Sequence, residues 1–280
     1  MKIGLIGTGN MGTAIIKGYL AANPGKEKDI YAFDKDESKL NSLSDELNIQ
    51  ACQNGADAAA YCDTLILAVK PNVFSKAIQE IASSIDWNNK ILVSIAAGIS
   101  IDHIEDLCKK MSGCQDDNKS FYCKIVRVMP NTPALVGKGM SALCRNSSVS
   151  DSDFKPILDL FSAVGKAEEI DEKLIDCVVG VSGSSPAYVY LFIEALADGA
   201  VMQGMDRKSA YAFAAQSVLG SAEMVLKTGM HPGTLKDMVC SPGGTTIDAV
   251  ASLERNGFRN AVIEAVNVAS EKSAAMQKNK

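Results

Sequence analysis

A glycine-rich turn near the start of the chain constrains its fold more than any other feature. The apolar run Ile3–Ile6 leads directly into Gly7–Gly12 (GTGNMG), and an amphipathic segment, 11–22, follows it. In such a unit the first glycine permits the turn, the second admits a pyrophosphate to the main chain, and the third lets helix and strand pack closely. The helix N-terminus also offers free N–H groups to phosphates. The sequence therefore predicts a dinucleotide-binding βαβ unit.

Strand and helix patterns alternate through the first 110 residues, which indicates parallel strands joined by right-handed helical crossovers. The predicted strands are Ile3–Ile6, Ile30–Phe33, Thr64–Val69 and Ile91–Ile95, with two more at about 124–129 and 140–144. The predicted helices are 11–22, 36–47, 73–85, 101–111 and one near 153–164. The polar segment Gly113–Ser120 is expected to be an exposed loop. The fold class is therefore α/β, with an N-terminal Rossmann-type doubly wound parallel sheet.

The second half of the chain has a different texture, because strand-like runs give way after about Gly165 to long, alanine-rich helical patterns. We predict a dinucleotide-binding domain over 1–165 and an all-helical domain over 166–280. The segments 186–204 and 208–227 carry apolar residues around most of their circumference, which a helix surrounded by water would not tolerate. They predict a dimerisation surface, hence a homodimer, and leave open its assembly into a higher oligomer. The alternative is a large self-contained helical core.

Charge and composition exclude several classes of protein. The formal net charge is −5 without any run of lysines or arginines, so nucleic acid is not an expected partner. Eight cysteines are scattered singly and only two histidines are present, which predicts reduced, mostly buried thiols and no metal site. The start has no basic n-region, and Glu194 and Asp198 interrupt the longest apolar stretch. We therefore expect a soluble, cytoplasmic protein without a membrane partner.

The end of the second predicted strand bears on the choice of coenzyme. A carboxylate there hydrogen-bonds the ribose hydroxyls of NAD and repels the additional phosphate of NADP, so Asp34 favours NADH. Lys35, the next residue, could instead pair with that phosphate. A charged turn at the end of a strand is a third interpretation. The cofactor is therefore predicted as NADPH or NADH.

Three further segments are more specific than these patterns: Ala68–Pro71 (AVKP), Arg127–Pro133 (RVMPNTP) and Asp237–Thr246 (DMVCSPGGTT). Together with Gly183–Tyr188 (GSSPAY), they resemble the pyrroline-5-carboxylate reductase family over essentially the full length. The resemblance implies an oxidoreductase in which NAD(P)H delivers hydride to the C=N bond of 1-pyrroline-5-carboxylate. The product is L-proline, and the reaction is the last step of proline biosynthesis.

The resemblance also implies where the ligands lie. Together with the residues discussed above, the expected cofactor-binding residues are Ile6, Gly7, Thr8, Gly9, Asn10, Met11, Gly12, Asp34, Lys35, Ala68, Val69, Lys70, Pro71, Ile95, Ala96, Ala97 and Asn131. The expected substrate-binding residues are Ser241, Gly243, Gly244, Thr245 and Thr246. This chain departs from the family at Ser185, where many members carry glycine, at Asp34, where they often carry a small polar residue, and at Gly55, where an asparagine is often an adenosine contact.

The predicted substrate loop has a composition suited to a carboxylate. It precedes the helical pattern Ile247–Glu254, so backbone N–H groups gather at a helix start, and the threonine hydroxyls add neutral donors. An iminium can arrive already protonated, so the protein need not supply a strong acid, and the matched motifs contain no catalytic dyad. We expect Thr246 to be the catalytic residue, as hydrogen-bond partner of the ring nitrogen. Lys70 is an alternative proton donor.

Two other functions compete with this one. A β-hydroxyacid dehydrogenase has a similar architecture and a Gly-x-x-Gly-x-Gly-x-x-x-Lys motif, which Gly180 and Gly183 fit. Ser185 replaces the third glycine, however, and Val189 stands where that chemistry needs its lysine. A nicotinamide-binding sensor without turnover would have no need of the Ser241–Thr246 loop.

Overall fold

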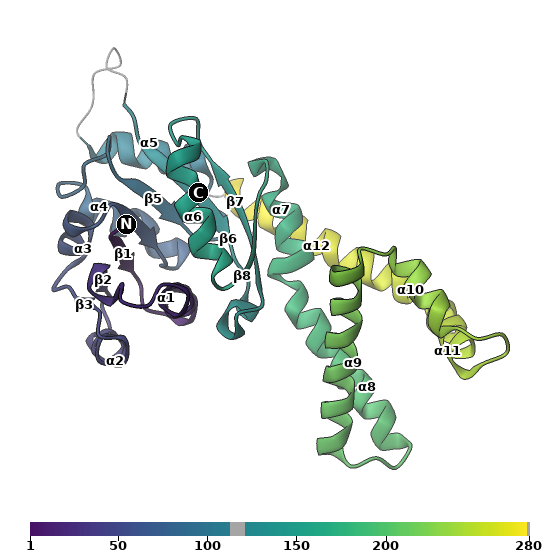
Figure 1. Ribbon diagram of the computed structural model, residues 1–280. Helices are drawn as coiled ribbons and strands as arrows, with labels where there is room; N and C mark the ends of the chain where they lie inside the picture. The colour runs from purple at the N-terminus through teal and green to yellow at the C-terminus, as the bar shows by residue number, and fades with distance from the viewer. Residues whose placement is uncertain (113–120, 279–280) are drawn as a thin grey trace. The chain divides into compact units, whose positions relative to one another are not determined.

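The structure is a computed structural model that describes residues 1–112 and 121–278, so the predicted loop Gly113–Ser120 lies outside the described residues. The chain forms two compact units. The sheet unit comprises Met1–Gly183 and the C-terminal segment from Ala269, and the helical unit comprises Ser184–Val268. Figure 1 shows the sheet in the purple to teal part of the chain and helices alone in the green part.

The sheet unit is built on one eight-stranded sheet with the strand order β3-β2-β1-β4-β5-β6-β7-β8. Every neighbouring pair is parallel except β6 and β7. The strands are β1 (Ile3–Ile6), β2 (Ile30–Phe33), β3 (Gln50–Ala51), β4 (Thr64–Leu67), β5 (Ile91–Ser94), β6 (Lys124–Met129), β7 (Gly139–Arg145) and β8 (Gly165–Glu169). Because β1 lies between β2 and β4, the strand order reverses there, which is where doubly wound sheets bind ligands.

Helices cover both faces of this sheet. Apolar residues of α1 (Asn10–Ala22), α2 (Glu37–Leu47) and α6 (Asp151–Ser162) pack in one core cluster, on one face. Those of α3 (Gly55–Tyr61), α4 (Phe74–Ile81) and α5 (Ile101–Met111) pack in a second cluster, on the other. The predicted doubly wound α/β fold is therefore confirmed.

The six predicted strands and five predicted helices of this half occur, some with the predicted bounds and others with ends shifted by a few residues. Among the strands and α-helices up to residue 170, those not predicted are β3, α3 and β8. The last corrects the expectation that helices alone follow Gly165. Its sequence, GKAEE, lacks apolar alternation because it is a largely exposed edge strand that pairs only with β7. Charged residues on edge strands are a common protection against aggregation, and they hide such strands from pattern analysis.

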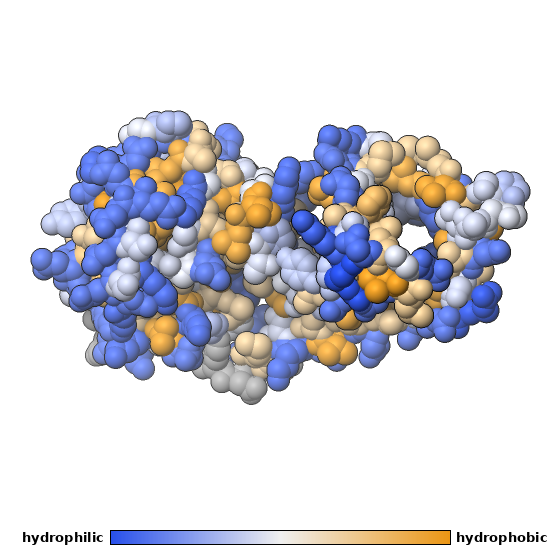
Figure 2. Space-filling model, turned by 90° about the horizontal axis from the view of Figure 1, so that it is seen from below, coloured by the Kyte–Doolittle hydropathy of each residue, from blue (hydrophilic) through white to orange (hydrophobic). Residues whose placement is uncertain are grey.

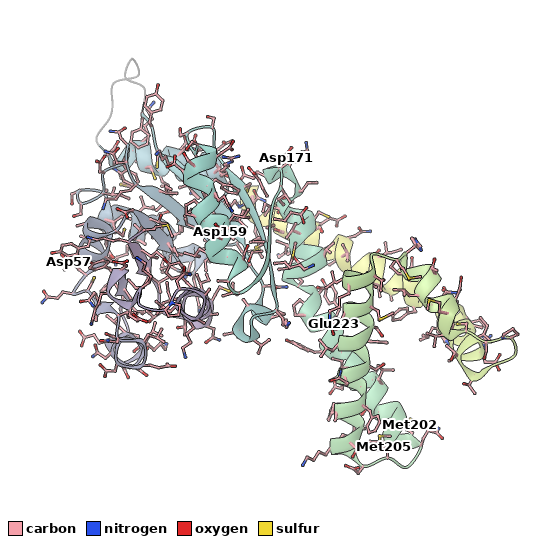
Figure 3. All side chains as sticks on the ribbon, in the orientation of Figure 1. Asp57, Asp159, Asp171, Met202, Met205 and Glu223 are labelled. Atoms are coloured by element: carbon pink, nitrogen blue, oxygen red, sulfur yellow. The ribbon has the colours of Figure 1, made fainter. Side chains whose placement is uncertain are left out.

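The helical unit contains α8 (Ser185–Met202), α9 (Arg207–Thr228), α10 (Pro232–Val239), α11 (Thr245–Arg255) and the first part of α12 (Phe258–Lys278). Helices α8 and α9 form an antiparallel hairpin, and Met202 and Met205 lie together at its turn (Figure 3). Tyr188 of α8 donates a hydrogen bond to the Ala265 carbonyl of α12 at 3.2 Å. The ring centroids of Phe192 and Phe258 lie 5.9 Å apart.

The compact units divide the chain later than the predicted domain boundary at 165/166. Residues between the two positions form β8 and the helical turns that follow it, which end in a π-helical turn at Val179–Gly183. The chain returns to the sheet unit through α12, where Ser273 and Gln277 donate hydrogen bonds to Asp176 at 2.6 and 2.7 Å. The predicted division into domains stays a prediction.

One helical stretch in the described part of the chain, Glu172–Met202, is long and apolar enough to cross a membrane, judged by length and composition alone. The sequence predicts no span there because of Glu194 and Asp198, but two acids leave the stretch apolar on average. Asp198 forms an ion pair with Arg207. Apolar helices that pack against protein have the same composition, so this property alone does not distinguish a membrane from a protein partner.

Candidate active site

The glycine turn has the geometry that a phosphate-binding turn requires. Gly7 has φ +101°, and a Cβ atom there would lie 2.5 Å from the Ala68 carbonyl oxygen. A Cβ on Gly12 would lie 2.3 Å from the Gly7 carbonyl oxygen, so only glycine allows this approach of helix and strand. A Cβ on Gly9 would meet no atom within 4 Å. No side chain caps α1, so its first N–H groups and the open space beside Gly9 fit an incoming pyrophosphate.

A pocket of about 310 Å³ begins at this turn and lies at the carboxyl ends of β1, β2 and β4. It brings together predicted cofactor residues from three separate parts of the chain: Ile6, Gly7, Gly9, Asp34, Lys35, Ala68, Val69 and Lys70. Thr8, Asn10, Met11 and Gly12 belong to the same turn and the start of α1, and Pro71 follows Lys70. The arrangement is that of a dinucleotide site at the point where the strand order reverses.

Asp34 is fixed by the glycine turn itself. Its Oδ2 accepts hydrogen bonds from the Thr8 backbone N–H at 2.6 Å and from the Thr8 hydroxyl at 3.0 Å. Its Oδ1 accepts from the Asp36 N–H at 2.9 Å. Because a carboxylate oxygen can accept two hydrogen bonds, Oδ1 retains capacity for a ribose hydroxyl. The carboxylate is therefore held in place before a ligand arrives.

Lys35 is also paired. Its Nζ lies 3.0 Å from Oε1 of Glu80, a residue of α4 that also lines the pocket. Both side chains keep considerable exposure, at 63% and 38%, so solvent screens the pair.

The remaining predicted cofactor residues follow the neighbouring strands β5 and β6. Ile95, Ala96 and Ala97 come directly after β5, and the Ile95 N–H bonds to the Leu67 carbonyl of β4 at 3.3 Å. Asn131 follows β6, but its side chain forms hydrogen bonds within the protein. Its Oδ1 accepts from the Met140 N–H at 2.8 Å, and its Nδ2 donates to the Ser182 carbonyl at 3.0 Å. The contact of Asn131 with a cofactor therefore remains a prediction.

The predicted substrate loop lies in the helical unit and forms a tight turn before α11. The Gly244 N–H bonds to the Ser241 carbonyl at 3.0 Å, and Gly243 has φ +64°. No side chain caps α11, whose first two residues are Thr245 and Thr246. Thr246 is half-buried and Thr245 exposed. The loop thus presents uncapped N–H groups and hydroxyls together, the chemistry that a carboxylate ligand needs.

Four pocket residues were not predicted from the sequence: Phe33, Val73, Ala77 and Glu80. The last three share one face of the helical segment that runs into α4, because they are spaced by four and then three residues. The amphipathic pattern over 73–85 contains this spacing. Only the packing of α4 against the sheet shows that this face borders the pocket.

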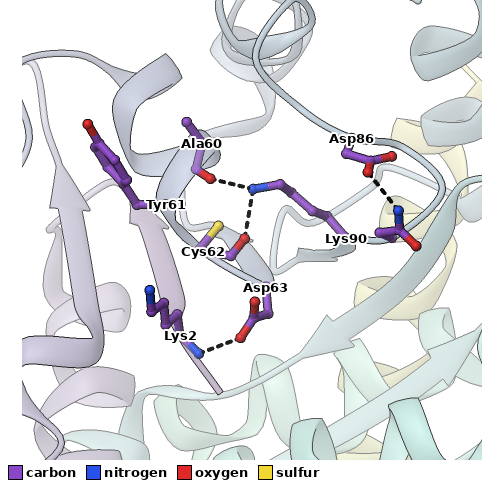
Figure 4. Close-up of a pocket in the computed structure, with 8 residues that line it drawn as sticks. Lys2, Ala60, Tyr61, Cys62, Asp63, Asp86 and Lys90 are labelled. Atoms are coloured by element: carbon purple, nitrogen blue, oxygen red, sulfur yellow. Dashed lines mark hydrogen bonds between the residues drawn. The ribbon is translucent and has the colours of Figure 1, made fainter.

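A second pocket, of about 420 Å³, lies at the opposite edge of the sheet and includes Lys2, Asp63 and Asp86 (Figure 4). Its central cation is Lys90, which donates to the carbonyl oxygens of Ala59, Ala60 and Cys62. These carbonyls end α3, so Lys90 completes the helix C-terminus rather than a ligand site. Within residues 1–112 and 121–278, no three His, Cys, Asp or Glu side chains gather as metal ligands.

Comparison with known proteins adds to this geometry. A family model described as pyrroline-5-carboxylate reductase dimerisation matches residues 172–276, and one described as NADP oxidoreductase, coenzyme F420-dependent, matches residues 2–98. The chain is 48% identical to pyrroline-5-carboxylate reductase of Escherichia coli strain K12 over 99% of both chains. The chain belongs to the pyrroline-5-carboxylate reductase family. The family that the sequence motifs predict is therefore confirmed.

Solved structures of family members agree over the whole fold. A Plasmodium falciparum pyrroline carboxylate reductase with NADP bound matches with a TM-score of 0.84 at 36% identity, covering 99% of this chain and 98% of that one. A pyrroline-5-carboxylate reductase from Coxiella burnetii matches with a TM-score of 0.89 at 30% identity, covering 98% of each. Both of these relatives thus share the fold of the two units.

Proposed function

We propose that this chain reduces the C=N bond of 1-pyrroline-5-carboxylate to L-proline with hydride from NADPH or NADH, as a cytoplasmic enzyme of proline biosynthesis. The observation that carries the proposal is that one chain, similar over 99% of its length to a reductase of this name, keeps both the open glycine turn and the uncapped Ser241–Thr246 loop. A dinucleotide sensor would need only the first of these features.

The residues of the sheet unit fit a reduced nicotinamide dinucleotide. The uncapped start of α1 and the space beside Gly9 receive the pyrophosphate, and Asp34 supports the adenosine ribose. Residues 68–71 and 95–97 follow β4 and β5 at the carboxyl edge of the sheet, where they line the nicotinamide half. The bound coenzyme supplies the hydride. The protein contributes orientation and exclusion of water, which account for much of the rate in such reactions.

The substrate loop supplies the polar contacts. N–H groups at the start of α11 bind the carboxylate, and Gly243 and Gly244 leave the main chain accessible to it. The Thr246 hydroxyl accepts a hydrogen bond from the N–H of the iminium. When the ring carbon takes up the hydride, the C=N π electrons become the lone pair of the product amine. The nitrogen already carries its proton, so no residue has to act as a strong acid.

We further propose that the helical unit functions as a homodimer. Its long helices expose large apolar side chains, including Tyr190, Leu191 and Phe213 at 60%, 68% and 69%. Figure 2 shows hydrophobic residues at the surface of this unit. Each Å² of apolar surface removed from water stabilises an association by about 25 cal/mol, which would favour contact between two such faces. A second copy is also consistent with the dimerisation model that matches residues 172–276.

The proposal is tested by following the absorbance of the reduced nicotinamide with purified protein and 1-pyrroline-5-carboxylate. We expect oxidation of the coenzyme in equal amount to L-proline formed, measured by chromatography. Nicotinamide binding without oxidation, at substrate concentrations up to the millimolar range, would overturn the catalytic proposal and favour a sensor.

A further inference from the structure

We propose that Glu80 selects the coenzyme: by holding Lys35 it leaves Asp34 as the charge that governs the 2′ position of the adenosine ribose, so that the site favours NADH over NADPH. The inference rests on the proposed function, since it assumes a nicotinamide dinucleotide in the pocket. It assigns a specificity-determining role to a residue of α4 that no sequence motif contains.

The charges around the pocket bear directly on the 2′ position of the ribose. Four charged side chains line it: Asp34, Lys35, Lys70 and Glu80. Lys70 follows β4, whereas Asp34 and Lys35 follow β2, the strand whose end meets the adenosine ribose in Rossmann folds. Binding of a 2′-phosphate therefore depends on the balance between Asp34, which repels it, and Lys35, which would attract it.

The Asp34 carboxylate cannot easily turn away from the 2′ position of the ribose. Its two oxygens accept three hydrogen bonds, two of them from Thr8 within the glycine turn. Thr8 is itself buried, at 5% exposure. A 2′-phosphate carries a charge of about −1.5 to −2 at neutral pH. Its approach to Asp34 would thus bring like charges together with no change of side-chain conformation available at low cost.

The cation, Lys35, already has a partner. Lys35 Nζ lies 3.0 Å from Glu80 Oε1, so a phosphate has to compete with a carboxylate for it. The pair is exposed and adds little to folding stability. It nevertheless sets the direction of the flexible lysine side chain, because Glu80 belongs to α4, a helix that also lines the pocket. Removing the Glu80 charge would free Lys35 to neutralise a 2′-phosphate.

The test uses the full-length protein and two probes that need no turnover, 5′-AMP and 2′,5′-ADP, with dissociation constants from calorimetry. We expect the parent protein to bind AMP more tightly than 2′,5′-ADP. Glu80→Gln should improve 2′,5′-ADP relative to AMP about threefold to fivefold, the size of an exposed ion pair. Glu80→Asp, which keeps the charge, should stay near the parent ratio. Asp34→Ser should shift the ratio further, by about tenfold.

Two further variants make the result specific. Lys35→Met in the Glu80→Gln background should abolish the gain, whereas Lys70→Met should leave it. Glu46→Gln is the matched control, because it breaks an exposed Lys17–Glu46 pair on the same unit, away from the pocket. It should leave the ratio unchanged. Melting curves should show all these variants folded.

The outcomes separate this inference from the proposed function. If both probes bind and Glu80→Gln leaves their ratio unchanged, or if Lys70→Met rather than Lys35→Met removes the gain, the role of Glu80 is overturned. Tighter binding of 2′,5′-ADP than of AMP by the parent protein would also overturn it. If neither probe binds, the dinucleotide site itself is wrong, and the proposed function fails with it. Kinetics with NADH and NADPH should reproduce the probe ratios in kcat/KM.

Discussion

The sheet unit and the helical unit bury their apolar residues to very different degrees. In the sheet unit, two clusters of large aliphatic and aromatic side chains fill both faces of the sheet. In the helical unit, the buried cluster consists of Ala197, Ala210 and Ala214. Its larger apolar residues lie at the surface. A sheet covered by helices on both faces completes its own core, whereas helices in a hairpin, apolar on several sides, need a second surface.

The comparison also explains where the polar chemistry lies. The glycine turn is supported by buried strands, so its geometry is determined within one unit. The substrate loop precedes α11, a helix in which no residue is buried. Its rigidity therefore depends on whatever covers the helical unit. We expect the first site to survive dissociation of a dimer and the second to lose its function.

Separating the copies should have the largest effect. Leu191→Glu together with Phe213→Glu places charges on both long helices, and we expect the dimer to become a monomer without measurable turnover. Sedimentation velocity gives the assembly, and binding of AMP should persist. Val136→Glu, at an equally exposed apolar position of the sheet unit, is the control. A double variant that stays active as a monomer would contradict the dimer proposal.

Removing the Thr246 hydroxyl should have the next largest effect on turnover. Thr246→Ala is expected to lower kcat by about ten- to a hundredfold, because the iminium loses its hydrogen-bond partner. The affinity for the coenzyme should hardly change, since the turn that binds it lies in the sheet unit. Steady-state kinetics and coenzyme titration measure the two quantities. Thr245→Ala offers a neighbouring comparison, and equal losses at both positions would remove the special role of Thr246.

Two glycines of the turn allow a sharper test of the sheet unit. Gly7→Ala forces a side chain into a positive φ and against the Ala68 carbonyl, so we expect a loss of about 2 kcal/mol or more in unfolding free energy. Gly9→Ala meets open space in the protein and should leave stability nearly unchanged, but its methyl group would occupy the place of the pyrophosphate. Denaturation in urea and coenzyme binding separate these effects. Unchanged affinity in Gly9→Ala would argue against the phosphate site.

Buried thiols should produce the smallest effect. Burial raises the pKa of Cys62 to about 11 and that of Cys144 to about 12, from the ordinary 9.0. A folded pKa above the unfolded one contributes stability below pH 9 that is lost as the pH rises towards 11 or 12. The urea midpoint should therefore fall between pH 9 and pH 11. It should fall less in Cys62→Ala, and an identical decline there would assign the effect to other groups.

Buried and exposed cysteines should also differ in how fast their thiols react. The raised pKa of Cys62 keeps its thiol protonated at pH 8, and the residue is buried. Cys177 is exposed, and Cys52 and Cys240 are intermediate. A thiol reagent followed by mass spectrometry should label Cys177 early and Cys62 only after unfolding. Early labelling of Cys62 would show that the sheet unit opens locally.

Much of the sheet unit could be predicted from its sequence, because its strands are short apolar runs and its glycine turn has fixed spacing. Pattern failed at β3 and β8, a two-residue strand and a charged edge strand. For the site, the motifs predict residues that would act through the main chain, such as Gly9. They could not identify Glu80, whose proposed contribution depends on which way α4 faces. Nor could they show that Asn131 accepts a hydrogen bond from Met140 and donates one to Ser182, 51 residues away in the chain.

The hydrogen bonds from Ser273 and Gln277 to Asp176 have a consequence for synthesis of the chain. The sheet unit receives its last segment from the very end of α12, after the whole helical unit has been translated. The sheet can form while the ribosome is still at work, but its attachment to α12 can close only after Ser273 and Gln277 have been translated. A ribosome that stops early leaves a product with the coenzyme turn complete and this closure missing, a difference that a quality-control protease could detect.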